Sequence, residues 1–278
     1  MSRARVICNS TISFQSSIVN RERFMFFAID IGNTNITLGL YRGETLGPRW
    51  RFASDCDKTP DEYGVLLSCL FQRSKASAAD ISAVAVASVV PPLTGIFEEV
   101  CSRMFHCVPL VVNATHKTGV RILYDDAGQV GADRIVDVAA GYKLYGGPAC
   151  IIDFGTATTF DAVSSEGDYL GGAIAPGIGI AAQALFARTA KLPKVDLHWP
   201  PSPIGRNVAH SLQSGLMFGY VGLVEGIVRR FREELGPATK VIATGGFAEI
   251  IAKETKAISI FAPWLTLDGL RIIYELNR

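Results

Sequence analysis

Short apolar runs alternate along the chain with longer stretches in which apolar positions recur at the helical period. The run MFFAIDI at 25–31 predicts a buried strand that ends at a Gly-Asn turn, and ITLGLY at 36–41 predicts its hairpin partner. A helix is predicted at 59–73, with Thr59 as its cap and Pro60 at its first helical position. The remaining elements of this half are a strand at 83–91, a helix at 93–105 and a strand at 108–113. Strands that alternate with helices in this way are typical of a layered α/β domain.

The pattern then begins again in the second half of the chain. Its predicted elements are a helix at 131–146, a strand, turn and strand at 149–163, a further strand at 167–177, helices at 178–191 and 206–236, and a strand, glycine turn and helix at 240–254. This restart predicts a first domain at 25–128 and a second domain at 129–278, with a C-terminal helix that can return to pack on the first domain. Residues 1–24 show no clear period and are interpreted as a tail.

Each half opens on the same arrangement of residues. AIDIGNTNIT at 28–37 and IIDFGTATTF at 151–160 both end an apolar strand with an aspartate, place a glycine two positions later, and continue into threonines. A single hairpin with a glycine turn is common. Two copies at the heads of two α/β halves predict a duplicated fold in which the hairpins face each other across a cleft.

The residues of these hairpins suit phosphate chemistry. A carboxylate at the end of a buried strand, such as Asp30 or Asp153, needs a compensating charge or hydrogen bond. The glycines and small polar residues that follow can bring backbone N–H groups and hydroxyls close to a phosphate. Carboxylates for a hydrated cation and donors for phosphate oxygens are the requirements of phosphoryl transfer. The alternative is that the two aspartates only cap their turns.

Two further segments carry candidate chemistry. ATGGFAE at 243–249 follows a strand and opens a helix, where a glycine loop can lie against adenine or face a phosphate. QVGADRIVD at 129–137 places Asp133 and Arg134 at a predicted helix start, where Asp133 could accept a hydroxyl proton and Arg134 could pair with an anionic substrate group. The alternative for this pair is an acid that complements the helix dipole beside a surface arginine.

Composition limits the other function classes. The chain has 278 residues, nearly half of them hydrophobic, and its 27 basic and 26 acidic residues leave a net charge of +1. This balance argues against a nucleic-acid or membrane-surface partner, no apolar run approaches the roughly 18 residues of a membrane span, and no P-loop motif is present. Residues 1–24 are rich in Arg and Ser, as transit peptides are, but the preferred interpretation is that Met25 is the true start. Six cysteines without zinc-binding spacing predict free thiols in a reducing cytoplasm: Cys8, Cys56, Cys69, Cys101, Cys107 and Cys150.

Taken in order, these motifs resemble one family, the type III pantothenate kinases. The resemblance rests on AIDIGNTNITLGLY, SVVPPL at 88–93, VGADR, IDFGTATT, GGAIAPG and RTAKLP at 188–193, and it extends over most of the chain from Met25. It implies two duplicated actin-like domains of the ribonuclease H-like type, an interdomain nucleotide cleft, and a homodimer. It further implies that ATP phosphorylates pantothenate to 4′-phosphopantothenate, the first step of coenzyme A biosynthesis, with Mg²⁺ and a monovalent cation, K⁺ or NH₄⁺, as cofactors.

The resemblance also assigns roles to individual residues. Nine hairpin residues would bind the phosphates of ATP: Asp30, Ile31, Gly32, Asn33, Thr34, Asn35, Ile36, Thr37 and Thr156. Six residues would contact pantothenate: Tyr124, Gly131, Ala132, Asp133, Arg134 and Thr189. Asp153 would hold the monovalent cation, Mg²⁺ would lie near Asp30, and Asp133 would be the general base, which favours catalysis over the helix-dipole alternative.

One residue departs from the family pattern. Asp137 stands where asparagine is expected in many relatives, one helical turn after Asp133, so it could perturb the base or be mistaken for it. The apolar, glycine-rich segment at 214–228 is either a dimer interface or a buried core helix.

Two rival functions follow from the same motifs. A kinase of the same superfold that acts on a sugar or short acid would need insertions for which this chain has little room. A nucleotide-gated regulator without catalysis would not need to keep the four charged residues of the motifs together: Asp30, Asp133, Arg134 and Asp153.

Overall fold

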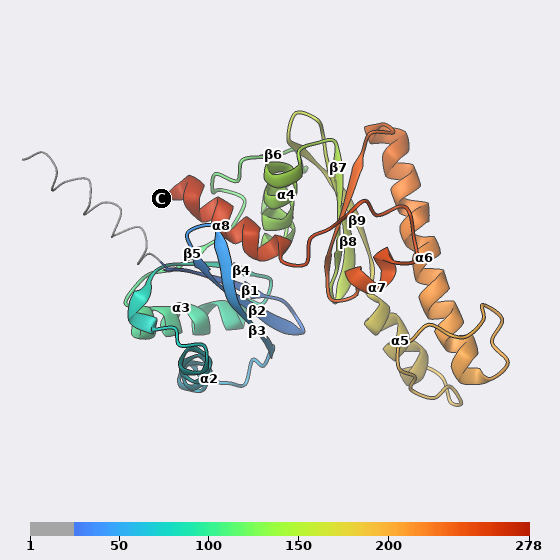
Figure 1. The fold of residues 1–278 in the computed structure, drawn as a ribbon, viewed down its shortest axis with the longest axis horizontal. Helices are drawn as coiled ribbons and strands as arrows, with labels where there is room; N and C mark the ends of the chain where they lie inside the picture. Colours follow the sequence, from blue (N-terminus) through green and yellow to red (C-terminus); the bar gives the residue numbers. More distant parts are fainter. Residues whose placement is uncertain (1–24) are drawn as a thin grey trace, which may run out of the picture.

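The computed structural model describes residues 25–278, which form two β-sheets with helices on their faces (Figure 1). The interpretation of residues 1–24 lies outside the described residues. The strands are β1 (Met25–Ile31), β2 (Asn35–Arg42), β3 (Thr45–Ala53), β4 (Ile81–Ser88), β5 (Leu110–Val111), β6 (Arg121–Ile122), β7 (Ala149–Phe154), β8 (Ala157–Val163), β9 (Asp168–Pro176), β10 (Lys240–Gly245) and β11 (Ile260–Phe261). The α-helices are α2 (Pro60–Arg73), α3 (Pro91–Phe105), α4 (Ala132–Tyr145), α5 (Ile178–Ala187), α6 (Val208–Leu235), α7 (Ala248–Ala252) and α8 (Leu265–Asn277).

The two sheets repeat one topology, which confirms the predicted duplication. The first sheet has the order β3-β2-β1-β4-β5, and the second has the order β11-β10-β7-β8-β9-β6. In each sheet three consecutive strands, β1 to β3 or β7 to β9, form an antiparallel meander. A later strand, β4 or β10, pairs in parallel with the opening strand of the meander, and β5 or β11 pairs in parallel with that later strand. The second sheet has one additional strand, β6, which pairs in parallel with β9. Because β1 and β7 occupy the same position in this order, the loops that follow them, Gly32–Asn33 and Gly155–Thr156, are equivalent in the two halves.

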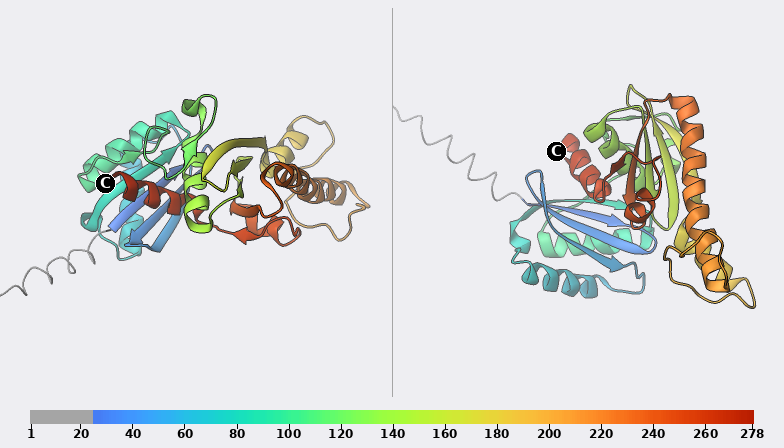
Figure 2. Two further views of the ribbon diagram at one scale, coloured as in Figure 1. Left: turned by 90° about the horizontal axis from the view of Figure 1, so that it is seen from above. Right: turned by 45° about the vertical axis from the view of Figure 1, so that its right-hand side comes forward.

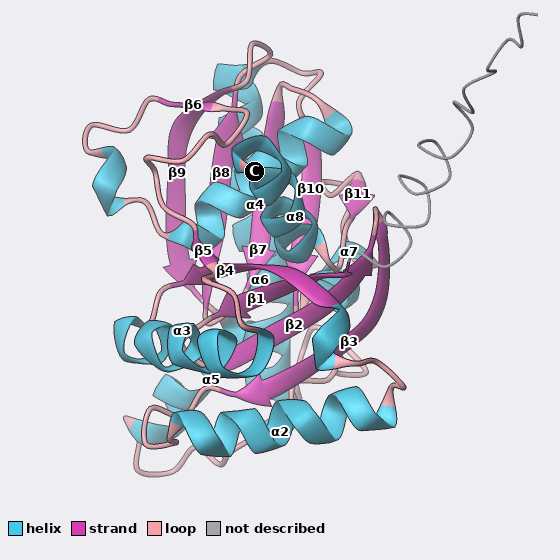
Figure 3. Cartoon of the chain, turned by 90° about the vertical axis from the view of Figure 1, so that its left-hand side faces the viewer, coloured by secondary structure: helices cyan, strands magenta, loops and turns pink. Residues whose placement is uncertain are grey.

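Alternation along β1 divides the first sheet between two cores. Phe27 and Ile29 point to one face, where α2 and α3 cover them, and Phe26 and Ala28 point to the other face, toward α4 and α8 (Figure 3). The helix predicted at 59–73 is confirmed as α2, and Thr59 caps it by accepting a hydrogen bond from the backbone N–H of Glu62. Such a cap is favourable because it satisfies a helix N–H group that has no partner within the helix.

Helix α6 covers the outer face of the second sheet (Figure 2). Its buried residues Met217, Tyr220, Val224 and Val228 pack with Ile152 of β7 and its neighbours. By length and composition alone α6 could also cross a membrane, although its sequence contains no uninterrupted apolar run of about 18 residues. Its inner face contributes these buried residues to the core, although only 28% of its most apolar 18-residue stretch is buried.

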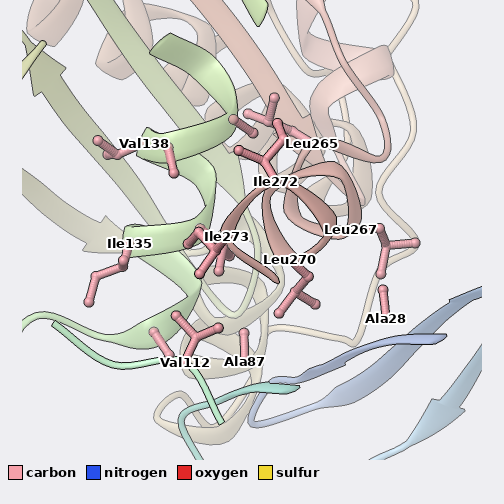
Figure 4. Close-up of a cluster of buried hydrophobic side chains, with 14 of the residues drawn as sticks. Ala28, Ala87, Val112, Ile135, Val138, Leu265, Leu267, Leu270, Ile272 and Ile273 are labelled. Carbon is pink, nitrogen blue, oxygen red and sulfur yellow. The ribbon is translucent and has the colours of Figure 1, made fainter. Parts of the chain in front are cut away.

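Helix α8 lies between α4 and the first sheet (Figure 4). Its residues Leu267, Leu270 and Ile273 belong to the same buried cluster as Ala28 and Ala87. The helices approach closely at Gly269, where a Cβ atom would lie 2.1 Å from the backbone oxygen of Val136. The C-terminal helix therefore returns to the first sheet, while the division of the chain after residue 128 stays a prediction.

The main element missed from sequence is β3. Within it Leu46, Trp50 and Phe52 are partly buried and alternate with exposed residues, but Gly47 and Pro48 interrupt the pattern. Proline is tolerated there because β3 lies at the edge of its sheet. The strand predicted at 108–113 is shorter than expected, since only β5 pairs with β4.

Candidate active site

The turns after β1 and β7 meet at a cleft of about 660 Å³ between the two sheets. A hydrogen bond joins Thr34 Oγ1 and Thr156 Oγ1 across it, with 2.8 Å between the oxygens. A hydrogen bond of 2.6 Å from Ser54 Oγ to the backbone oxygen of Gly32 stabilises the first turn. The glycine loop predicted from ATGGFAE also reaches this cleft through Thr244, Gly245 and Gly246. All three glycine loops identified in the sequence thus border one space.

Most of the predicted nucleotide residues line this cleft. They are Asp30, Gly32, Asn33, Thr34, Asn35, Thr37 and Thr156, together with Asp133 and Asp153. Ile31 and Ile36 do not, because they face each other across the hairpin and their side chains are fully buried in the core beneath it. Only their backbone groups are available to a ligand.

Asp133 lies at the N-terminal end of α4. Its Oδ1 accepts a hydrogen bond of 2.8 Å from the backbone N–H of Arg134. Gly131 makes room for this carboxyl, since a Cβ atom there would lie 2.4 Å from Oδ1. Burial raises the pKa of Asp133, and the hydrogen bond from Arg134 and its charge oppose that effect. A carboxylate with a raised pKa in a cleft is a suitable general base.

Two more carboxyls of the cleft have raised pKa values. Burial raises the pKa of Asp30 well above its ordinary value, and the charges of Asp133 and Asp153 add to the effect. Burial, followed by the charge of Asp133, raises the pKa of Asp153 to about 7. Arg51 opposes both shifts. Carboxyls whose mutual repulsion is incompletely compensated favour the binding of a cation.

Small residues surround the carboxyl of Asp153, the predicted cation ligand. Glycines border its carboxyl, because Cβ atoms at Gly155 and Gly245 would lie 3.1 Å and 2.4 Å from its oxygens. No group of three or more His, Cys, Asp or Glu side chains within residues 25–278 is arranged to hold a metal. A cation at Asp153 would therefore complete its coordination with backbone, water or phosphate oxygens, which suits K⁺ and Mg²⁺.

Arg134 is buried, so the alternative of a surface arginine is wrong. Its Nε donates to Asp161 Oδ1 at 2.8 Å, and its Nη2 lies 2.7 Å from the same oxygen. Tyr169 donates its hydroxyl to that oxygen at 2.7 Å and stacks on Tyr124, with ring centroids 6.0 Å apart. The guanidinium carbon lies 6.0 Å from the ring centroid of Tyr124. Tyr124 and Arg134, both predicted to contact pantothenate, thus lie together, but neither of them lines the cleft that Asp133 borders.

Sequence reasoning missed Asp161 and Tyr169. The available signal was an aspartate inside the apolar strand β8, since a charge in such a strand requires a buried partner. Thr189 is exposed after α5, does not line the cleft, and donates its hydroxyl to the backbone oxygen of Leu185 at 2.7 Å.

Asp137 lies one turn behind Asp133 and is buried, with 2% of its surface exposed. Burial, and then the charge of Asp153, raise its pKa well above the ordinary value. Its Oδ1 has no hydrogen-bond partner among the residues that the structure describes. Asp137 is therefore a further buried carboxyl of raised pKa, close enough to the charges of Asp30, Asp133 and Asp153 to be affected by them.

Comparison with known proteins identifies the family of this arrangement. The sequence profile described as type III pantothenate kinase matches residues 26–230. Proteins named type III pantothenate kinase from Roseiflexus sp. (strain RS-1) and Moorella thermoacetica (strain ATCC 39073 / JCM 9320) are each 52% identical, with 91% of this chain and 100% of each relative covered. A third, from Geobacter sulfurreducens, is 51% identical over 254 residues.

Solved structures support the fold alone. A conserved putative Baf family transcriptional activator from Campylobacter jejuni superposes with a TM-score of 0.56 at 19% identity, covering 90% of this chain and 98% of that protein. The ethanolamine utilization protein EutJ from Carboxydothermus hydrogenoformans has a TM-score of 0.50 at 12% identity, with 90% and 89% covered. The sequence matches, together with two facing phosphate hairpins and an acidic helix start between them, show that this chain belongs to the type III pantothenate kinase family.

Proposed function

We propose that this chain transfers the γ-phosphoryl group of ATP to the primary hydroxyl of pantothenate, which yields 4′-phosphopantothenate for coenzyme A biosynthesis. The observation that carries the proposal is Asp133, a carboxyl of raised pKa that lines the same cleft as both phosphate hairpins. Two hairpins with hydrogen-bond donors for phosphate and a general base in the same cleft suit in-line phosphoryl transfer.

Asp133 accepts the proton of the pantothenate hydroxyl in the proposed reaction. The hydroxyl oxygen forms a bond to the γ-phosphorus, the bond from that phosphorus to the bridging oxygen breaks, and ADP leaves with the electron pair. The hairpin residues Gly32 to Thr34 and Thr156 bind the phosphate oxygens. When bound near Asp30 and at Asp153, Mg²⁺ and a monovalent cation supply neutralisation of the phosphate charge.

Arg134 is proposed to bind the carboxylate of pantothenate. Asp161 and Tyr169 hold one edge of its guanidinium, so the fork keeps a fixed orientation. A guanidinium fixed in this way can make a bidentate pair with a carboxylate. The rings of Tyr124 and Tyr169 beside it would exclude water from that pair.

The test is ATP turnover by the purified protein, with and without pantothenate, in potassium and in sodium buffer. We expect ADP release that depends on pantothenate and potassium and that falls at least about 100-fold in Asp133→Asn, because a general base contributes roughly 10²–10⁴ in rate. Asp80→Asn, an exposed aspartate on another element, is the matched control and keeps full turnover. Turnover that ignores pantothenate, or that persists in Asp133→Asn, would contradict the proposal.

We further propose a homodimer through the exposed face of α6. Gly215, Gly219 and Gly222 lie along that face, and apart from the adjoining backbone of α6 no atom of the described residues comes within 4 Å of a Cβ atom built on any of them. Phe218 on α6 and Phe186 on the neighbouring α5 are exposed apolar residues. Small residues beside large apolar ones allow two helices to approach closely.

Light scattering after gel filtration tests this assembly. We expect a dimer for the natural chain and a monomer for Gly219→Arg, whereas Gly64→Arg on α2, also in open space, leaves the dimer intact. A dimer would also allow Thr189, which lies outside the cleft of its own chain, to contact the pantothenate bound by the partner. The five cysteines within residues 25–278 are all free thiols, which supports a cytoplasmic location.

A further inference from the structure

Strand β3 brings a cation into the cleft that the sequence motifs do not include. Trp50 and Phe52 pack against the core that α2 covers. Successive side chains of a strand point to opposite faces, so Arg49 and Arg51 point to the other face. Arg49 lies 4.8 Å from the ring centroid of Trp264, a residue of the cleft wall, and Arg51 itself lines the cleft.

The register of the first sheet aligns Arg51 with the nucleotide motif. Asp30 on β1 is directly opposite Thr37 on β2, and Thr37 is directly opposite Arg51 on β3. Residues that are directly opposite in antiparallel strands point to the same face, and neighbouring strands are about 4.8 Å apart. The long side chain of Arg51 can therefore extend over Thr37 toward the space in front of Asp30.

The second sheet carries no such cation at the equivalent place. Its matching row runs from Asp153 to Thr159 and then to Ile174, which is 65% exposed. The duplicated motif therefore has an arginine in one copy and an apolar residue in the other. Because the second sheet forms without an arginine at this position, we infer that the fold does not require Arg51 and that its role is in ligand binding.

Arg51 is also the one cationic side chain that lines the cleft within residues 25–278, against three carboxyls, Asp30, Asp133 and Asp153. None of the ion pairs formed within those residues involves it. Its charge acts on both Asp30 and Asp153, which come from different sheets, so it lies where the two hairpins converge. In the proposed function, the γ-phosphoryl group would pass through this same space to reach a hydroxyl at Asp133.

We propose that Arg51 donates hydrogen bonds to the transferring phosphoryl group of ATP, as a catalytic residue of the phosphoryl transfer that the proposed function describes. A planar guanidinium presents several donors to adjacent phosphate oxygens and stays charged at any working pH. An arginine that stabilises the charge of a transferring phosphoryl group contributes roughly 10³–10⁵ in kcat in other phosphotransferases. This role rests on the proposed function for the identity of the acceptor, pantothenate. The contact between Arg51 and the nucleotide can be tested without an acceptor.

The first test compares kcat for the natural chain, Arg51→Lys and Arg51→Gln. We expect Arg51→Gln to lose at least about 100-fold in kcat and Arg51→Lys to recover only part of it, because an ammonium cannot bridge two oxygens. Guanidinium ions added to Arg51→Ala should restore part of the lost rate, which a purely structural role would not allow. Arg73→Gln, an exposed arginine at the end of α2, is the control and keeps full activity.

The second test measures binding of ADP and of the non-hydrolysable analogue AMP-PNP, and it does not depend on the acceptor. We expect Arg51→Gln to weaken AMP-PNP at least about tenfold while ADP binding stays within about twofold, since hydrogen bonds to charged groups contribute about 1.5–3 kcal/mol. Equal loss for both nucleotides, or no loss of either binding or kcat, would overturn the assignment to the transferring group. The two proposals can fail separately. If Arg51→Gln selectively weakens AMP-PNP binding but ATP turnover by the natural chain does not depend on pantothenate, the proposed function is contradicted and the role of Arg51 is retained.

Discussion

Thr34 Oγ1 and Thr156 Oγ1 lie 2.8 Å apart and share a hydrogen bond, although 122 positions separate these residues in the chain. One hydroxyl comes from the turn after β1 and the other from the turn after β7. The contact therefore joins the two copies of the duplicated motif at the point where a phosphate chain would enter. It makes the two copies neighbours at one cleft.

Replacement of either hydroxyl should weaken ATP binding. Thr156→Val keeps the shape of the side chain and removes its hydrogen bond, so we expect ATP affinity to fall about tenfold, as for a lost hydrogen bond to a charged group. Thr156→Ser retains the hydroxyl and should bind ATP nearly as the natural chain does. Calorimetric titration with ATP distinguishes the two variants, and equal affinities would show that this hydroxyl does not contact phosphate.

Gly131 should control the position of the general base. A Cβ atom in Gly131→Ala would lie 2.4 Å from Asp133 Oδ1, so the carboxyl has to move. Displacement of a catalytic group by about 1 Å can cost about 100-fold in rate, and we expect kcat to fall by about 10- to 100-fold with little change in thermal stability.

The matched control is Gly95→Ala on α3, where no atom outside the adjoining helix backbone lies within 4 Å of the new Cβ. This variant should keep its kcat and gain up to about 1 kcal/mol in the free energy of unfolding, because alanine favours a helix interior over glycine. Steady-state kinetics and chemical denaturation of both variants check the pair. An unchanged kcat in Gly131→Ala would show that the Asp133 carboxyl can move without loss of activity.

Asp161 should be required for both stability and substrate binding. Its ion pair with Arg134 is buried, with 8% and 1% of the two side chains exposed. Loss of one partner from a buried pair costs about 3–5 kcal/mol, and we expect that loss in the free energy of unfolding of Asp161→Asn. The KM for pantothenate should rise as well, because Arg134 loses its orientation.

An exposed pair of the same kind provides the comparison. Arg121 donates to Asp168 on β9, but the Arg121 side chain is 71% exposed. Asp168→Asn should therefore change stability little, since water replaces the partner of an exposed charge. Urea denaturation that showed equal losses for both variants would mean that the Asp161 pair is not specially important.

The raised pKa of Asp153 predicts how stability varies with pH. Its carboxyl has an ordinary pKa of 3.8 in the unfolded chain and about 7 in the folded protein, where burial is the main cause. Between these values the folded state binds more protons, so without added cations the free energy of unfolding should fall as pH rises from 4 to 7.

Asp153→Asn removes this contribution and should show a shallower fall over the same range. Asp30, whose pKa is also raised by burial, keeps part of the slope. Chemical denaturation in a buffer free of metal ions, repeated across the pH range, measures both slopes. A natural chain that gained stability from pH 4 to 7 would contradict the raised pKa. Restoration of stability by K⁺ at pH 7, in the natural chain but not in Asp153→Asn, would support Asp153 as the cation ligand.

Local features of the fold could be predicted from the sequence because their causes lie within a few residues of each other. The glycine turns after Asp30 and Asp153, and the Thr59 cap of α2, follow from turn geometry and capping chemistry, and the structure has them where they were expected. The repeated motif also predicted the duplication, since two equal local patterns build two equal hairpins. The same reasoning missed β3, because Gly47 and Pro48 hide the alternation that pairing with β2 imposes.

The partners of the charged groups depended on the tertiary structure. Asp161 compensates Arg134 only because β8 packs beside α4, and the side chain of Ile31 points away from the cleft only because its face of β1 is in the core. Arg51 reaches the cleft through the register of three strands, which no periodicity of its own segment reveals. The sequence by itself determined which local structures form and which chemical groups they carry. The packing of the two sheets decided which of those groups meet, because burial and charge compensation depend on neighbours that are distant in the chain.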